Sequence, residues 1–342
     1  MKIKKIIIEK LKGCLNKELH QFREKYYRLF LKLPKRKSLL KILCYHRVCN
    51  KDIGSFLNKY WSISISPIVF QNQLRILSNS HIPVILVSDY LQLIHSEKEF
   101  SDHLAITVDD CYKDSYTVIF PLLKKYKMRA TFFPTVANIG SKKANWQDKL
   151  YFLWSKPGNR EKIRRISQKI CIKYCDYYND CNFINFFKEK LSWKDKQTIM
   201  GYLDNELLWE EEDRFAGQMY LSWDELREMK NGGMEFGSHG LHHVSFTCMS
   251  QEEKYEEISV SKKKLEQNLN TQIDIFCYPY GYFSKEDADI LKRAGYKMAV
   301  GSYPKPNISS EDLFSLGRFL IFPGARGGHI SEDLMDFKRK LF

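Results

Sequence analysis

Short apolar segments alternate with longer amphipathic ones over most of this sequence, from residue 42 to residue 322. The apolar segments have the length of buried strands, and the amphipathic ones carry apolar residues at helical spacing. The expected strands are 42–45, 83–87, 104–108, 130–136, 234–236, 275–278, 298–300 and 318–322, and the expected helices are 67–78, 115–126, 222–231, 250–268 and 285–294. This alternation predicts parallel βα units, as in a barrel or a doubly wound sheet.

The alternation breaks between about residues 145 and 217. This stretch is rich in Lys, Tyr, Phe and Trp, and its apolar spacing is mostly helical. We therefore expect a helical insertion here. A chain of 342 residues is long enough for one large α/β domain or for two modest ones. We accordingly expect an N-terminal arm, residues 1–40, and a body, residues 41–342, that contains the insertion.

The positive charge is concentrated in the N-terminal arm. The net charge is +14, and residues 1–50 hold fifteen Lys and Arg against three acidic residues, so this segment carries +12 of it. From residue 3 to residue 33, apolar residues recur at helical spacing between basic ones, which predicts a basic amphipathic helix. Such a helix suits an anionic membrane surface; the alternative is that it packs on the body. The nearly neutral body argues against nucleic-acid binding.

The sequence shows neither a transmembrane segment nor a signal peptide. No run of about 18 apolar residues is present, and charged residues interrupt the first twelve positions, where a signal peptide would need an apolar core. The nine cysteines are irregularly spaced and form no CxxC pair, which argues against a zinc ribbon and favours a reducing compartment. We expect a cytoplasmic protein that the arm could hold at the inner face of the cell membrane.

Two acidic residues follow the expected strand 104–108. Asp109 and Asp110 are adjacent carboxylates, which repel each other unless the fold separates them or supplies a cation. In a βα barrel the active site lies at the carboxyl ends of the strands, where this pair falls. The pair therefore indicates a catalytic site, and the alternative is a helix N-cap in a solvated turn.

Three histidines, His239, His242 and His243, follow the expected strand 234–236. His239 and His243 are four residues apart, close enough for both imidazoles to reach one ion. Zinc accepts two imidazole nitrogens and a carboxylate oxygen, and a catalytic site keeps one position open for water. The cluster therefore predicts a metal site, against the alternative of a His-rich surface turn.

The segment 276–281, Phe-Cys-Tyr-Pro-Tyr-Gly, closes another expected strand. Its proline and glycine predict a tight turn that could present a backbone N–H and an aromatic ring to a ligand. A simple turn at a strand end is the alternative. Because all three segments end strands of the same expected βα array, each one strengthens the case for a shared site.

Together the three segments resemble the motifs of the polysaccharide deacetylase family (the NodB homology fold, carbohydrate esterase family 4-like). T-F-D-D-G is matched by Thr107-Val108-Asp109-Asp110-Cys111, H-[ST]-x-x-H by His239-Gly240-Leu241-His242-His243, and R-x-P-[YF]-G by Cys277-Tyr278-Pro279-Tyr280-Gly281. The resemblance covers about residues 42–323 except the insertion. It implies a distorted (β/α)7 TIM-like barrel with one divalent metal, Zn²⁺ or alternatively Co²⁺ or Ni²⁺. It also implies hydrolysis of the N-acetyl group of an amino sugar in a polysaccharide, oligosaccharide or glycolipid, in bacterial cell-surface glycan biosynthesis.

The resemblance also implies roles for individual residues. The metal ligands would be Asp110, His239 and His243, and Asp109 would be the catalytic base. The backbone N–H of Tyr280 would stabilise the oxyanion. The expected contacts with the sugar are the aromatic rings of Tyr112, Trp146, Tyr278 and Tyr280, together with Pro279 and His46. The alternative is that the aromatic residues belong to the core, which is their commoner place, and that His46 is a buried histidine with its hydrogen bonds satisfied.

The sequence departs from the family pattern in several places. Cys111 replaces a glycine, Gly240 replaces the Ser or Thr that usually braces the histidines, and Cys277 stands where many members have an arginine that orients the base. The closing motif, which supplies an acid histidine in many members, has no assigned counterpart. The segment 316–320 fits its place but contains no histidine, which leaves His46, His242 and His329 as weak candidates.

These departures leave two other functions open. One is a catalytically impaired glycan-binding protein on the same fold. It is favoured by the cysteines at two motif positions, Cys111 and Cys277, and by the missing acid. The other is an amidase acting on a non-sugar amide, since the same chemistry would serve. The intact Asp-Asp pair and the His-x-x-x-His spacing favour the deacetylase.

Overall fold

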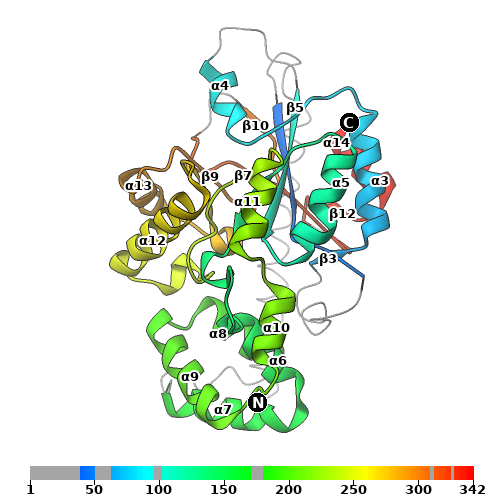
Figure 1. Ribbon diagram of the computed structural model, residues 1–342. Coiled ribbons are helices and arrows are strands. Elements are labelled where there is room, and N and C mark those ends of the chain that lie inside the picture. The colour runs from blue at the N-terminus through cyan, green and yellow to red at the C-terminus, as the bar shows by residue number, and fades with distance from the viewer. Residues whose placement is uncertain (1–38, 51–62, 96–101, 171–179, 309–311, 325–326) are drawn as a thin grey trace, which may run out of the picture.

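A single parallel sheet organises the body of the protein. The computed structural model describes residues 39–50, 63–95, 102–170, 180–308, 312–324 and 327–342. Its main sheet has the strand order β12-β11-β1-β5-β6-β7, with β4 beside β5 and β10 beside β1 (Figure 1). The strands are β1 (Leu39–Tyr45), β4 (Val84–Ile85), β5 (His103–Asp110), β6 (Thr131–Pro134), β7 (Glu235–Phe236), β10 (Asn307–Ile308), β11 (Phe319–Phe322) and β12 (Ile330–Ser331). All pairings are parallel except that of β10 with β1.

The central strand β5 is buried on both faces from Leu104 to Asp110. A parallel strand with both faces covered is a near-continuous apolar run, which explains why the segment Leu-Ala-Ile-Thr-Val precedes the two aspartates. Strands β8 (Ile275–Cys277) and β9 (Met298–Val300) form a second parallel pair. Isolated bridges join Ser238 to Phe276 and Val300 to Leu316, so this pair continues the strand array beyond β7.

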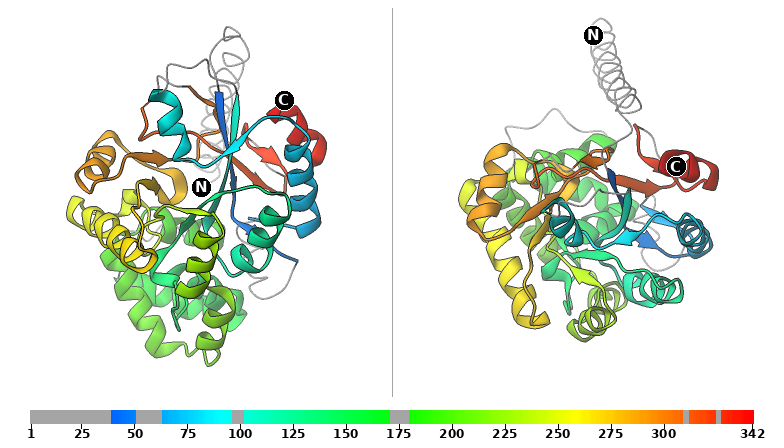
Figure 2. Two further views of the ribbon diagram at one scale, coloured as in Figure 1. Left: turned by 45° about the horizontal axis from the view of Figure 1, so that its top comes forward. Right: turned by 90° about the horizontal axis from the view of Figure 1, so that it is seen from above.

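Helices lie around the strands, as the view from above shows (Figure 2). They are α3 (Pro67–Ser78), α4 (Asp89–His95), α5 (Phe120–Lys125), α11 (Trp223–Asn231), α12 (Gln251–Leu269), α13 (Lys285–Arg293) and α14 (Leu334–Leu341). Serine side chains cap the N-termini of α3, α11, α12 and α13, where each accepts a bond from an otherwise unpaired backbone N–H. This is an α/β fold with a parallel central sheet.

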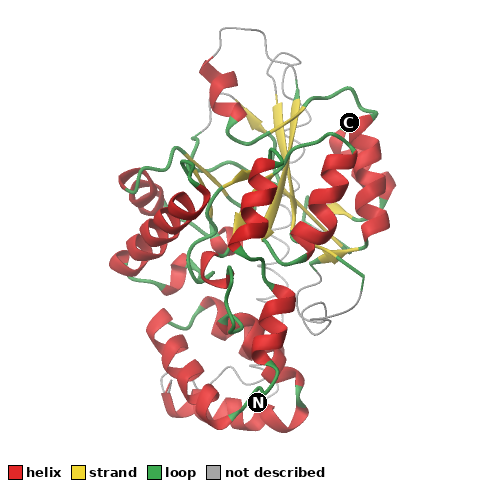
Figure 3. Cartoon of the chain, in the orientation of Figure 1, coloured by secondary structure: helices red, strands yellow, loops and turns green. Residues whose placement is uncertain are grey.

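Five helices form a separate layer, which we call the helical layer. They are α6 (Trp146–Ser155), α7 (Pro157–Ile170), α8 (Asp180–Glu189), α9 (Trp193–Glu206) and α10 (Glu212–Met219). Figure 3 shows them gathered away from the strands. Their apolar side chains form a core of their own, which includes Leu150, Trp154, Phe187, Leu203 and Phe215. The layer therefore packs as a unit, and residues at its edge are available to face the ends of the strands.

Most predicted elements are present within a residue or two. The expected helix 115–126 differs, because it begins as a π-helical turn, η1 (Ser115–Ile119), before α5. The sequence analysis did not anticipate α4, α14, β10, β12 or the short pair β2 (Arg47–Val48) and β3 (Ser64–Ile65). The arm helix expected at residues 3–33 lies outside the described residues. Among the helices that are described, none has the length and apolarity needed to cross a membrane.

Candidate metal and active site

The three predicted segments meet at the carboxyl ends of the strands. Asp109 and Asp110 end β5, His239 and His243 lie in the loop after β7, and Tyr280 lies in the turn after β8. Among the described non-glycine residues, seven have a positive φ, and four of them are here: Asp110, Cys111, His243 and Tyr280. Left-handed backbone at residues with side chains is strained and tends to occur at functional sites.

Asp110, His239 and His243 lie close enough together to hold one ion. The Nε2 atoms of His239 and His243 are 3.5 and 3.2 Å from the same carboxylate oxygen of Asp110. All three side chains are buried, and their ligand atoms lie within 4.8 Å of one another.

Each imidazole is oriented by an acceptor behind it. Nδ1 of His239 donates to the Cys277 carbonyl at 2.8 Å, and Nδ1 of His243 donates to Oε1 of Gln147 at 3.0 Å. Because both partners are acceptors, the protons belong on Nδ1, and Nε2 presents a lone pair to the site. Burial lowers the pKa of both histidines, that of His243 well below its usual value, which keeps both rings neutral.

Asp110 lacks the partners that a buried carboxylate needs. Neither of its oxygens accepts a hydrogen bond from any described residue. Burial first, and then the charge of Asp109, raise the pKa of Asp110 well above its usual value. Two lone pairs and an unpartnered carboxylate therefore converge on one point, an arrangement that a cation would stabilise. The donor set of two imidazoles and a carboxylate fits a zinc-type ion.

Asp109, in contrast, has a full set of partners. Arg318, just before β11, donates from both of its terminal nitrogens to the two carboxylate oxygens, at 2.7 Å each. Both residues are buried, and Arg318 is fully enclosed. Burial opposes ionisation of Asp109, but the Arg318 guanidinium outweighs it and holds the pKa of this carboxyl well below its usual range. Asp109 is therefore an ionised carboxylate with a fixed orientation, as a base would need to be.

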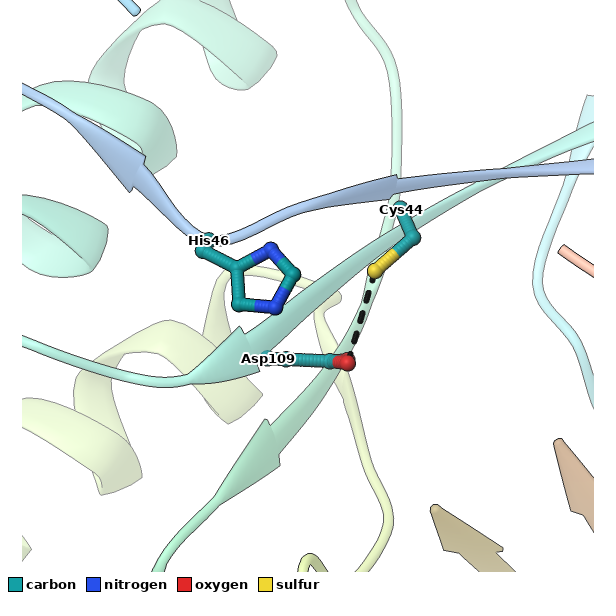
Figure 4. Close-up of side chains that lie close together, drawn as sticks. All are labelled: Cys44, His46 and Asp109. Carbon is teal, nitrogen blue, oxygen red and sulfur yellow. Dashed lines mark hydrogen bonds between the residues drawn. The ribbon is translucent and has the colours of Figure 1, made fainter. Parts of the chain in front are cut away.

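Two thiols and an imidazole surround Asp109. Sγ of Cys44 and Sγ of Cys277 lie 3.4 and 3.5 Å from the same Asp109 oxygen. Figure 4 shows the His46 ring beside this carboxylate, between β1 and β5. Burial lowers the pKa of His46 to about 4, and its Nδ1 accepts no bond from a described residue. The thiols are protonated, because burial raises the pKa of each well above its usual value.

The chain matches known deacetylases in sequence and in fold. The family model "Polysaccharide deacetylase" matches residues 97–174 and 179–299, more than half of the chain. The chain belongs to the polysaccharide deacetylase family. It is 20% identical over 309 residues to the poly-β-1,6-N-acetyl-D-glucosamine N-deacetylase of Staphylococcus aureus, with 85% of this chain and 81% of that protein covered.

Solved structures of deacetylases share the fold. The Streptococcus pyogenes deacetylase PplD, in complex with acetate, matches with a TM-score of 0.58 at 18% identity and covers 90% of this chain and 99% of its own. IcaB from Ammonifex degensii matches with a TM-score of 0.55 at 18% identity, covering 84% and 94%. As a polysaccharide deacetylase, the protein is a hydrolase of carbon–nitrogen bonds that acts on N-acetylated glycans, in a family that uses a divalent metal.

The site of this polysaccharide deacetylase replaces two missing motif residues from elsewhere in the chain. Arg318, just before β11, orients the Asp109 carboxylate, so Cys277 does not leave Asp109 without a cation. Glu257 on α12 replaces the bracing Ser or Thr at Gly240. Its carboxylate accepts bonds from the backbone N–H groups of Leu241 and His242, at 2.9 and 2.8 Å. Cys111, which stands where the family has a glycine, keeps the left-handed backbone that suits glycine (φ 55°).

The residues predicted to stack on sugars are mostly enclosed. Tyr112, Trp146 and Tyr278 are at most 7% exposed. The Tyr278 hydroxyl donates to the Phe314 carbonyl, and its ring stacks in the core. The Tyr112 hydroxyl donates to Asp148, and the Trp146 indole donates to the His242 carbonyl. The contacts of Tyr112 and Trp146 tie the helical layer to the strand array, and the prediction of a sugar platform draws no support from these buried rings. Pro279 is also buried, in the same turn as Tyr280.

The sequence analysis missed four residues that lie at the site: Arg318, Glu257, Gln147 and Lys188. A signal existed for Arg318, because a lone arginine beside the apolar strand 319–322 requires a buried anion. The others are polar residues on amphipathic helices, and nothing in their spacing distinguishes them from surface positions.

Proposed function

We propose that this chain is a metal-dependent N-deacetylase of an amino-sugar polymer or glycolipid. The observation that carries the proposal is the unpartnered, buried Asp110 carboxylate facing two neutral imidazoles, beside an Asp109 held ionised by Arg318. Asp110, His239 and His243 would hold the ion, and Asp109 would be the base. Imidazole and carboxylate donors favour Zn²⁺, with Co²⁺ or Ni²⁺ as alternatives.

The chain's own residues would divide the reaction among them. When bound, the ion supplies Lewis-acid activation of water and of the acetamide carbonyl. Asp109 takes a proton from the attacking water, and Arg318 keeps that carboxylate ionised and correctly aimed. The backbone N–H of Tyr280, in the turn after β8, would donate to the developing oxyanion. The products are acetate and the free amine.

The name of the Staphylococcus aureus relative suggests the substrate class. We infer a polymer or lipid-linked chain of N-acetylglucosamine, made for the cell surface. The free thiols of Cys44, Cys111 and Cys277, all buried at the site, support a reducing cytoplasm as its location. The basic arm would then hold the enzyme near lipid-linked substrate at the inner face of the membrane.

Metal analysis combined with acetate release tests the function. Purified protein is expected to hold about one divalent ion per chain and to release acetate from at least one member of a panel of N-acetylglucosamine oligosaccharides and glycolipids. The His239→Ala/His243→Ala variant is the control, and it should lose both metal and activity while remaining folded. Metal retained at full stoichiometry in that variant would remove the proposed ligand set. Glycan binding without acetate release would instead favour the glycan-binding alternative.

A further inference from the structure

Amide hydrolysis needs a proton donor in addition to a base. The leaving nitrogen must receive a proton as the carbon–nitrogen bond breaks, because an unprotonated amide nitrogen is a poor leaving group.

The three histidines considered from the sequence are poorly suited to donate this proton. His46 is neutral near pH 7, since burial lowers its pKa to about 4. His329 accepts a bond from the backbone N–H of Leu320 in β11. His242 lies 2.5 Å from Glu257 and braces the loop.

Lys188 reaches the site from the helical layer. It lies at the C-terminal end of α8, and its Nζ is 4.2 Å from the centre of the Tyr280 ring. That ring in turn lies 4.7 Å, centre to centre, from the ring of His243. The charge of Lys188 interacts with Asp110 and with His243, so the ammonium group lies near the proposed metal site. An ammonium over an aromatic face is held there by the ring's electrostatic field.

The backbone of Lys188 is held in place as well. Its carbonyl accepts a hydrogen bond from Nζ of Lys196 on α9, at 3.0 Å, and the Cys248 thiol lies 3.7 Å from the same oxygen. Lys196 is fully buried and lies over the Trp146 ring. The position of Lys188 is thus fixed by contacts with α9 and with the loop that follows the histidines, and not by its own side chain alone.

The buried cation Arg318, which also lies near the reacting groups, has no proton to give. Arg318 donates to the carbonyl of Gly301, to Thr107 and to both oxygens of Asp109. A guanidinium also keeps its proton under all physiological conditions. A lysine ammonium, in contrast, becomes a usable acid when burial lowers its pKa.

We propose that Lys188 is the general acid of the reaction and that it protonates the leaving nitrogen of the amino sugar. The proposal rests on the proposed function. In the step, the carbon–nitrogen bond of the tetrahedral intermediate breaks and its electron pair moves to nitrogen. That nitrogen takes a proton from the Lys188 ammonium, which becomes a neutral amine. The proton that Asp109 took from water is released to solvent with the acetate, and Lys188 regains a proton from solvent.

The charges around Lys188 set the direction of its titration. Burial lowers the pKa of Lys188, and the ammonium of Lys196 lowers it further. The carboxylates of Glu189 and Asp110 act in the opposite direction. His46 and His243, which are neutral, and the uncharged Tyr280 complete the surroundings. Because the acid must be protonated, activity is lost as the pH rises through the pKa of Lys188.

Four single variants test the proposal on an N-acetylglucosamine oligosaccharide. Lys188→Met removes the acid, Lys188→Arg keeps the charge without a proton to donate, and Lys188→His supplies a weaker cation that is a stronger acid. Lys190→Met is the matched control, since Lys190 is exposed two residues away. Metal content and thermal midpoint are measured for each variant, so that loss of the ion or of the fold is separated from loss of the acid.

The expected result is a fall of about 10²- to 10⁴-fold in kcat/KM for Lys188→Met and for Lys188→Arg, with metal content unchanged. The alkaline limb of the pH profile should vanish in Lys188→Met and move to lower pH in Lys188→His. The assignment is overturned if Lys188→Met keeps activity within about threefold of wild type, or if Lys188→Arg restores the activity. It is also overturned if the alkaline limb of the pH profile stays where it is in Lys188→His. Wild-type protein that releases no acetate from any glycan would remove the proposed function itself.

Discussion

Asp109 and Asp110 are neighbours in the chain, but their carboxylate oxygens have different hydrogen-bond partners. Both oxygens of Asp109 accept bonds from Arg318, whereas those of Asp110 accept none from the described residues. The two residues are consecutive in β5, and successive side chains of a strand point to opposite faces. The ionised Asp109 carboxylate is thereby suited to act as a base, and the unpartnered Asp110 carboxylate is suited to bind an ion.

Asparagine substitutions at the two positions should therefore have different effects. Asp109→Asn is expected to retain the metal and to lose activity by at least about 10²-fold, because a base is removed and no ligand is. Asp110→Asn is expected to weaken metal binding, because the anionic ligand is lost. Metal content and acetate release, measured on the same preparations, check both outcomes. The reverse pattern would mean that the two roles are exchanged.

The Asp109–Arg318 pair also makes a testable contribution to stability. Arg318→Met leaves a buried carboxylate without its cation, which should lower the free energy of unfolding by about 3–5 kcal/mol near pH 7. The double variant Asp109→Asn/Arg318→Met buries no unpaired charge and should recover most of that loss while remaining inactive. Urea denaturation of the three proteins measures these differences. Equal stability of the single and double variants would contradict this account.

The same pair predicts how stability changes with pH. Arg318 holds the pKa of Asp109 below its value in the unfolded chain, so the stabilisation is present above that unfolded value, about 3.9, and is lost as the pH falls through the folded one. In Arg318→Met the buried carboxyl binds its proton more readily. The stability difference between wild type and Arg318→Met should therefore begin to shrink above pH 4, at the raised pKa of Asp109 in the variant, and should continue to shrink as the pH falls toward the lowered folded pKa of wild type. A difference that stays constant down to pH 3 would contradict this.

Among the elements, α6 has more influence on the site than its distance from the sheet suggests. Its second residue, Gln147, accepts the Nδ1 proton of His243, and its third, Asp148, accepts bonds from the Tyr112 and Tyr220 hydroxyls at 2.9 and 2.7 Å. The first of these bonds orients a proposed metal ligand, and the others join the helix to the end of β5. The start of α6 is therefore part of the active site's support.

Gln147 should therefore affect metal affinity without touching the metal. Gln147→Leu removes the acceptor behind His243 and is expected to weaken metal binding by about 10- to 100-fold. Gln147→Glu keeps an acceptor and loses no described donor bond, since the Gln147 amide nitrogen has no described partner, and should retain the affinity. Gln218→Leu, at an exposed position in the same layer, is the control. Competition with a chelator measures the dissociation constants, and equal values for Gln147→Leu and wild type would exclude the positioning role.

Sequence patterns were sufficient for elements whose signals are local. The helix expected at 67–78 has those bounds in the structure, because Ser66 caps it and Pro67 fits its first turn. The strand expected at 298–300 is likewise present. Two-residue strands such as β10 and β12 were missed, because they exist only through pairing with distant strands. Arg318 and Glu257 were missed as site residues for the same reason, since their partners lie far along the chain and only the fold brings them together.

At the scale of the whole molecule, charge separates the arm from the body. Residues 1–40 hold thirteen Lys and Arg against three acidic residues and so carry +10 of the net +14, which leaves only +4 for the 302 residues of the body. A nearly neutral body has little long-range attraction to an anionic surface, whereas each Lys or Arg close to one contributes about 1 kcal/mol. The arm lies mostly outside the described residues, and its role remains a prediction from sequence. If it binds a membrane, that binding should be separable from catalysis.

Deleting residues 1–36 tests this separation. The truncated protein is expected to keep its thermal midpoint, its metal and its activity on soluble oligosaccharide, because every described site residue lies beyond the deletion. It should no longer sediment with vesicles that contain anionic phosphatidylglycerol. Full-length protein should sediment with those vesicles at low salt, much less at 0.5 M salt, where surface charges are screened within about 4–5 Å, and not with neutral phosphatidylcholine vesicles. Full-length protein that ignores anionic vesicles at low salt, or a truncation that unfolds the body, would mean that the arm packs on the barrel and that its basic residues face solvent.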